Sequence, residues 1–180
     1  MTAHELSPLD HHLTALAGAL TPFRASAQRL ARWGADLAAH LGTGGRLRTE
    51  RMPLSAIALT PDSSAVTAIG NDYGFDEVFA RQVRAHGRPG DVLLLLSTSG
   101  RSPNLVNAAH AAREIGMRTW AMAGAGSSPL ADACDETLHC PSADSQVVQE
   151  LHLVSVHVMC EYLDLALPGV LGKARTLVRS

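Results

Sequence analysis

The chain has 180 residues, a mass of 19.0 kDa and a formal net charge of −2, and 46% of its residues are hydrophobic. This length predicts one domain with a core of its own, and the near-neutral charge argues against nucleic acid or an anionic membrane as a partner. The N-terminus has no signal-peptide pattern and no apolar run approaches the ~20 residues of a membrane span, so we expect a cytoplasmic protein.

The first third of the chain is predicted to be helical. Between residues 9 and 41, apolar residues such as Leu13, Leu16 and Leu20 recur at three- and four-residue steps, and Pro22 marks a bend or a helix start. This segment packs either against another subunit or within the chain. After a polar connector at 46–51 we expect a strand over 55–60, a helix over 63–69, a loop over 70–74 and a helix over 75–85.

The most informative segment follows at residues 91–104. The apolar run Val92–Leu96 predicts a strand buried on both faces, and Ser102-Pro103 predicts the start of a helix that ends at Gly116. Backbone N–H groups, the helix dipole and the hydroxyls between strand and helix together favour an anion. A plain helix cap is the alternative. No Lys follows in the P-loop pattern, so we expect a monophosphate on a small molecule and no nucleotide cofactor.

The rest of the chain predicts strands at 118–122 and 136–140, a short helix at 129–134, and a long helix at 145–165 ended by Pro168-Gly169. Strands that alternate with helices favour a parallel sheet covered on both faces. The three cysteines have no C-x-x-C spacing, so we expect free buried thiols.

The long helix has polar residues on an otherwise apolar pattern. Gln149 and His157 are eight residues apart, about 80° around the helix and ~12 Å along it. They converge on one point only if both side chains lean inward or if they serve sites on neighbouring subunits. A hydrogen-bonded structural role is the alternative for either histidine of this helix, His152 or His157.

These segments resemble the sugar isomerase (SIS) domain, and within it the phosphoheptose isomerases. The likeness covers Arg46 to about Asp164 and includes Asn71-Asp-Tyr-Gly-Phe75, Ser97-Thr-Ser-Gly-Arg-Ser102, and Gln149-Glu-Leu-His152 with His157. It implies a three-layer α/β sandwich of the flavodoxin-like kind, in which helices flank a parallel sheet. Residues 1–45 would form a helical segment and residues 46–180 the phosphosugar-binding SIS domain.

The resemblance further implies aldose–ketose isomerisation of sedoheptulose 7-phosphate through an enediol(ate), in a homo-oligomer that is a dimer or a tetramer. Gln149 and His157 would line the reacting end, where some family members hold zinc, and His157 would transfer the proton. Such chemistry needs a base, an acid and a group that stabilises the oxyanion. The substrate would be bound by Ser97, Thr98, Ser99 and Ser102 at its phosphate and by Asn71 and Asp72 at its hydroxyls.

The chain departs from the family near its first connector. Family members have there a strand, a Gly-Asn-Gly-Gly-Ser type loop, and a helix with a catalytic Glu and a nearby His. Here Leu41-Gly-Thr-Gly-Gly-Arg46 leads almost directly into Arg48-Thr-Glu-Arg-Met-Pro53, so some two dozen residues and one strand of the sheet are missing. Glu50 and Glu150 are the candidates to replace the lost base.

Three functions follow from these observations. The first is a phosphoheptose isomerase-type enzyme, favoured by the hydroxyl loop, Asp72, Gln149 and His157. The second is a catalytically silent SIS module that binds a phosphosugar or a protein partner, favoured by the missing Glu. A nucleotide-binding α/β protein is the third, and the absence of the P-loop Lys argues against it.

Overall fold

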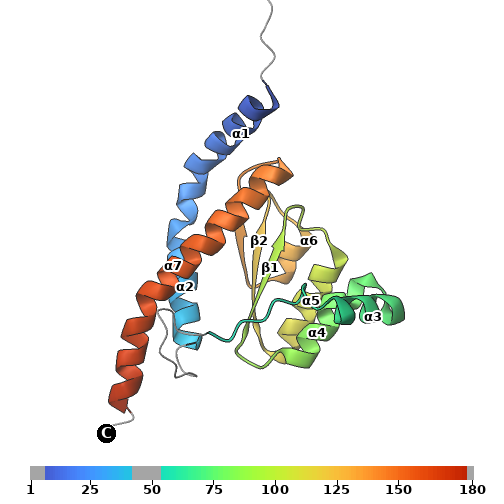
Figure 1. Cartoon of the computed structure of the whole chain (residues 1–180), viewed down its shortest axis with the longest axis vertical. Helices are drawn as coiled ribbons and strands as arrows, with labels where there is room; N and C mark the ends of the chain where they lie inside the picture. The colour runs from blue at the N-terminus through green and yellow to red at the C-terminus, as the bar shows by residue number, and fades with distance from the viewer. Residues whose placement is uncertain (1–6, 42–53, 178–180) are drawn as a thin grey trace, which may run out of the picture.

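The structure is a computed structural model that describes residues 7–41 and 54–177, and the side chains of these residues except those of Leu41 and 171–177. Helices and strands alternate over most of this length; the chain starts with two helices, which follow each other end to end, and finishes with a long helix (Figure 1). The elements, in chain order, are α1 (Pro8–Phe23), η1 (Arg24–Ser26), α2 (Ala27–Leu41), α3 (Ser63–Tyr73), η2 (Phe75–Glu77), α4 (Val78–His86), β1 (Val92–Ser97), α5 (Pro103–Ile115), β2 (Arg118–Ala123), α6 (Pro129–Ala133), β3 (Glu136–His139) and α7 (Ser145–Leu177).

The centre of the fold is a parallel sheet with helices on both faces. Among the described residues it has three strands in the order β1-β2-β3, with Leu94 opposite Trp120 and Trp120 opposite Glu136. Helices α2 and α7 lie on one face, and α4, α5 and α6 lie on the other (Figure 1). The predicted three-layer α/β sandwich is therefore confirmed, and so are the strands predicted from 92, 118 and 136 onwards.

The two faces of the sheet are packed with different kinds of residue. Towards α2 and α7 the core is large: Trp33 stacks on Trp120 with ring centroids 4.6 Å apart, beside Met122 and Leu151. Towards α5 the core is mostly alanine, and Ala121 of β2 meets the fully buried alanines of that helix. Small side chains let α5 lie close to the sheet, which places its N-terminus at the end of β1.

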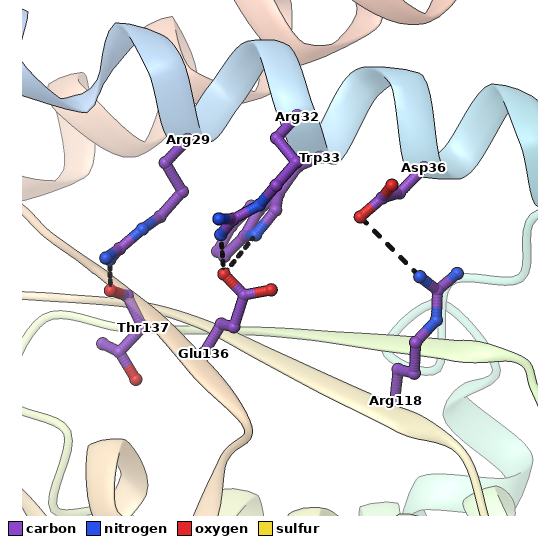
Figure 2. Close-up of polar contacts among 7 residues, drawn as sticks. All are labelled: Arg29, Arg32, Trp33, Asp36, Arg118, Glu136 and Thr137. Carbon is purple, nitrogen blue, oxygen red and sulfur yellow. Dashed lines mark hydrogen bonds and ion pairs between the residues drawn. The ribbon is translucent and has the colours of Figure 1, made fainter.

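Polar contacts fix α2 over the end of the sheet (Figure 2). Arg32 pairs with Glu136, Arg29 donates to the carbonyl of Thr137, and the indole N–H of Trp33 donates to the Glu136 carboxylate at 3.3 Å. Because these partners lie on β3 and α2 is packed against α7, the three elements form one packed unit.

Three predicted elements are wrong. Residues 54–58 have no regular structure and pair with no strand among the described residues, and 59–61 form a bend, so the strand predicted over 55–60 does not form. Ile57 is 66% exposed. A strand is stable only with a neighbour to receive its hydrogen bonds. Helix α3 continues through the predicted loop to Tyr73 and stops at Gly74, which has a φ of +90°. Helix α7 continues past Pro168 because Leu163 and Leu167 pack on Ala38 and hold this part of the helix.

The first helices agree with prediction. Pro22 lies in the last turn of α1, and the short turn η1 follows that helix directly, before α2 begins. The division predicted at residue 45 lies outside the described residues. All three cysteines are free as expected, but only Cys140 is buried, whereas Cys134 and Cys160 are half-buried. Burial raises the pKa of Cys140 to about 12 and that of Cys134 to about 11, so neither thiol is a nucleophile at neutral pH.

Helix α7 differs from expectation in one further way. Its segment Ser145–Val170 is long and apolar enough to cross a membrane, judged by length and composition alone. Only 22% of its most apolar window is buried within the chain. One face of this helix packs on α2 and the sheet, while Leu153 and Leu165 remain exposed. Leu9 and Leu13 of α1 are exposed as well.

Candidate active site

The loop between β1 and α5 is held in place by its own hydroxyls and by the next strand. The Ser97 hydroxyl accepts a hydrogen bond from the Gly100 backbone N–H at 2.9 Å, and Ser99 accepts one from the Arg101 N–H at 3.2 Å. Gly100 has a φ of +63°, a left-handed conformation that favours glycine. The Gly124 N–H, which follows β2, donates to the Thr98 carbonyl at 3.2 Å. The loop is therefore shaped before any ligand arrives.

Helix α5 begins directly after this loop. Ser102 is its N-cap residue, as predicted, but the Ser102 side chain makes no capping hydrogen bond. The hydroxyl thus remains available to a ligand at the positive end of the helix dipole. Because the Ser99 side chain is exposed and Ser102 is half-buried, both can reach an anion bound at the first turn of the helix.

A cavity of about 580 Å³ opens beside the loop. The hydroxyl loop and α5 form one wall, and α7 forms the opposite wall with a stripe of residues at helical spacing. No Asp or Glu is among the lining residues, so nothing in the wall repels a phosphate. The cavity is lined by Leu96, Ser97, Thr98, Ser99, Ser102, Leu105, Gln149, His152, Leu153 and Val156.

The structure brings only some of the predicted site residues together. The four hydroxyl residues of the loop and Gln149 line one cavity, whereas His157 is exposed and is not among the lining residues. The stripe that faces the cavity runs through 149, 152, 153 and 156, and the next residue, His157, is turned about 100° away from Val156. Within one chain, Gln149 and His157 therefore do not share a site.

Asn71 and Asp72 lie in the last turn of α3, where both are exposed. The Asn71 amide donates to the Asp72 carboxylate at 2.8 Å, and neither residue lines the cavity. Figure 1 shows α3 on the far side of the sheet from α7. Their predicted contact with sugar hydroxyls stays a prediction.

The expected zinc ion does not fit the residues that one chain offers. Among the described residues, no group of three or more His, Cys, Asp and Glu side chains could hold a metal ion. Gln149 lines the cavity, whereas His157 does not. Because zinc sites in proteins use three or four protein ligands, we derive no chemical step through a metal.

Glu150, one of the two candidate bases, lies beside the cavity rather than in its wall. It pairs with Nε2 of His12, from α1, at 2.8 Å and lines a second cavity of about 380 Å³. Glu50, the other candidate, lies outside the described residues. No carboxylate of the described residues therefore reaches the first cavity.

His152, for which the sequence indicates only a hydrogen-bonded structural role, belongs to the cavity wall. It is 6% exposed, lines the cavity, and its Nε2 has no hydrogen-bond partner among the described residues. Burial lowers the pKa of His152 below its ordinary value of 6.5, so the ring is neutral at pH 7. The spacing i, i+3, i+4, i+7 counted from Gln149 would have identified this stripe in the sequence.

The lowered pKa of His152 predicts a loss of stability in acid. The unfolded chain binds the proton more readily than the folded one, so the free energy of unfolding falls as the pH falls through 6.5. Urea unfolding at about pH 7.5 and pH 5.5 measures this change. The variant His152→Gln is expected to lose part of this pH dependence. An equal pH dependence in the variant and the wild type would contradict the assignment.

Comparison with known proteins places this fold in a family. A model described as SIS domain matches residues 35–124. The phosphoheptose isomerase of Streptomyces coelicolor is 50% identical over 190 aligned residues, which cover 93% of this chain and 81% of that protein. The chain belongs to the phosphoheptose isomerase family. A second family member, from Bradyrhizobium sp. strain BTAi1, is 53% identical over 123 residues, which cover 68% of this chain and 62% of that protein.

Solved structures of phosphoheptose isomerases superpose well on this chain. The phosphoheptose isomerase of Francisella tularensis has a TM-score of 0.79 at 29% identity, covering 89% of this chain and 100% of the other. That of Neisseria gonorrhoeae has a TM-score of 0.78 at 34% identity, covering 87% and 96%. The SIS fold is thus retained despite the shortened connector.

The alignment with the Streptomyces phosphoheptose isomerase also bears on the missing segment. Because 93% of 180 residues is about 167, about 23 of the 190 aligned positions have no residue in this chain. This number agrees with the loss of some two dozen residues expected from the sequence. In the described residues β1 pairs with β2 alone, and Leu96 on this strand is 43% exposed.

Proposed function

We propose that this chain is a phosphosugar aldose–ketose isomerase of the phosphoheptose isomerase type, acting on sedoheptulose 7-phosphate in the cytoplasm. The proposal rests above all on one observation: a preformed hydroxyl loop at the N-terminus of α5 faces Gln149 across a single cavity. Family membership and the names of the relatives support the same reaction class.

In this proposal each wall of the cavity has a separate task. The loop and the N-terminus of α5 bind the phosphate, so the sugar extends towards α7. The Gln149 amide donates to the oxygen that gains charge in the enediolate, and the neutral ring of His152 lies in the same wall. Phosphate binding at a fixed distance from α7 thereby orients the carbon atoms that exchange a proton.

The proton-transfer residue belongs to an assembly of several chains in this proposal. His157 keeps its proposed role by facing the cavity of a neighbouring copy in a dimer or a tetramer. The exposed apolar residues of α1 and α7, among them Leu9, Leu13 and Leu165, support such an assembly. A zinc ion at Gln149 and His157 remains a prediction that depends on further ligands from the other copy.

The second candidate is a silent SIS module that binds a phosphosugar without converting it. The observation that favours it is the absence of any Asp or Glu from the lining of the main cavity, among the residues the structure describes. A hydroxyl loop suffices for phosphate binding, whereas moving a proton between carbons needs a base.

Phosphate binding at the loop is tested by Ser99→Ala. The hydroxyl of Ser99 is exposed at the cavity, so its loss is expected to weaken binding of sedoheptulose 7-phosphate about tenfold, or ~1.4 kcal/mol. Isothermal titration calorimetry gives the affinity. The matched control is Ser64→Ala, an exposed serine of α3 outside both cavities, which is expected to bind like the wild type. Equal affinities for both variants would refute the assignment of the loop.

A further inference from the structure

A second cavity lies beside the first. It has a volume of about 380 Å³ and shares Gln149 and Leu153 with the main cavity, so these two side chains, which lie one turn apart on α7, form the boundary between the cavities. Its other wall comes from α1 through His12. The N-terminal helix thus reaches the neighbourhood of the phosphate loop, which its position in the sequence does not indicate.

The polar centre of this cavity is a pair between His12 and Glu150. A carboxylate can only accept, so the Nε2–H of His12 donates to Oε1 of Glu150 across 2.8 Å. The other carboxylate oxygen, Oε2, is buried and has no hydrogen-bond partner among the described residues. A buried acceptor without a donor is costly, and the Glu150 side chain as a whole is 43% exposed at the cavity, so a small rotation of its carboxylate would let Oε2 accept from a ligand hydroxyl.

The composition of the cavity limits what can bind. Gln146 and Gln149 add amide donors and acceptors, Leu153 adds apolar surface, and Glu150 contributes a negative charge. No Lys or Arg is among the residues that line it. A second phosphate is therefore disfavoured, whereas an uncharged polyhydroxylated chain finds both acceptors and donors.

We propose that the His12–Glu150 cavity binds the hydroxyl-bearing end of a phosphosugar whose phosphate lies at the Ser97–Ser102 loop, and that it selects for sugars long enough to cross the turn of α7. The inference rests on the proposed function, since it assumes a phosphosugar at the loop. His12 orients the Glu150 carboxylate, and Glu150 accepts from the sugar. This makes α1 a specificity-determining part of the site.

The test compares a short probe with a long one. Calorimetry with inorganic phosphate and with sedoheptulose 7-phosphate is run on the full chain and on His12→Ala. We expect the affinity for the sugar phosphate to fall about five- to tenfold while that for inorganic phosphate stays within about twofold. Retained phosphate binding shows that the variant is folded. Glu150→Gln keeps the shape of the side chain but weakens the acceptor. Like His12→Ala, it is expected to lower the affinity for the sugar phosphate and to leave that for inorganic phosphate nearly unchanged.

The matched control is His11→Ala, which removes the neighbouring exposed histidine of α1 outside both cavities. It is expected to bind both probes like the wild type. If His12→Ala and His11→Ala bind the sugar phosphate equally well, the His12–Glu150 pair is structural and the inference is wrong. If the wild-type chain binds no sedoheptulose 7-phosphate, the proposed function is wrong and the inference falls with it.

Discussion

Replacing Trp33 by alanine is expected to lower the free energy of unfolding by about 3–5 kcal/mol. The Trp33 side chain is fully buried, stacks on Trp120 at an interplanar angle of 4°, and donates its indole N–H to Glu136. Its loss leaves a cavity where α2 meets the sheet (Figure 2). Since single domains are typically stable by about 5–15 kcal/mol, the variant should have a large unfolded population under mild denaturing conditions.

Denaturant unfolding followed by circular dichroism measures this loss. The matched comparison is Trp33→Phe, which retains a ring on Trp120 but removes the donor to Glu136, so an intermediate loss is expected. A change below about 1 kcal/mol in Trp33→Ala would mean that α2 is not held by this stack, contrary to the packing described above.

Substituting Gly124 by alanine is expected to damage both stability and phosphate binding. A Cβ at this position would collide with the carbonyl oxygen of Thr98, which is backbone and cannot rotate away. The hydroxyl loop must therefore shift. Overpacking of this kind costs about 1–3 kcal/mol, and we expect affinity for the sugar phosphate to fall more than about tenfold because the donors no longer converge.

The control for this prediction is Gly18→Ala in α1, where an added Cβ meets nothing within 4 Å. That variant should gain about 0.5–1 kcal/mol, because alanine is favoured over glycine inside a helix, and should bind ligand unchanged. Thermal unfolding and calorimetry measure both quantities. Wild-type affinity in Gly124→Ala would show that the position of Thr98 is unimportant for binding.

The parts of the fold with strong local signals could be predicted from the sequence. The apolar run Val92–Leu96, the Ser102-Pro103 helix start and the Gly116 stop each have a local physical cause, and all three are confirmed. The strand predicted over 55–60 has the same kind of apolar pattern, but its formation depends on a neighbouring strand. Where no partner is available, intrinsic preference does not make a strand.

The candidate site likewise combines local features, which the sequence indicates, with contacts between distant segments, which it does not. The hydroxyl loop is a local feature that the sequence indicates directly, and the structure places its residues and Gln149 around one cavity, while their roles stay predictions. The resemblance groups His157 with Gln149, whereas in one chain only Gln149 lines the cavity. The contribution of His12 depends on how α1 lies against α7 (Figure 1), and sequence spacing contains no information on that contact.

The shortened connector lacks the segment that carries the catalytic Glu in the family, so the central claim to test is that this chain catalyses the isomerisation. The direct measurement is turnover of sedoheptulose 7-phosphate by the purified full chain, followed by proton NMR of the anomeric region, with and without added zinc. We predict that aldose signals appear and that Ser99→Ala slows their appearance. Binding of the sugar phosphate without any conversion, in either condition, would contradict the isomerase and establish the silent phosphosugar-binding module instead.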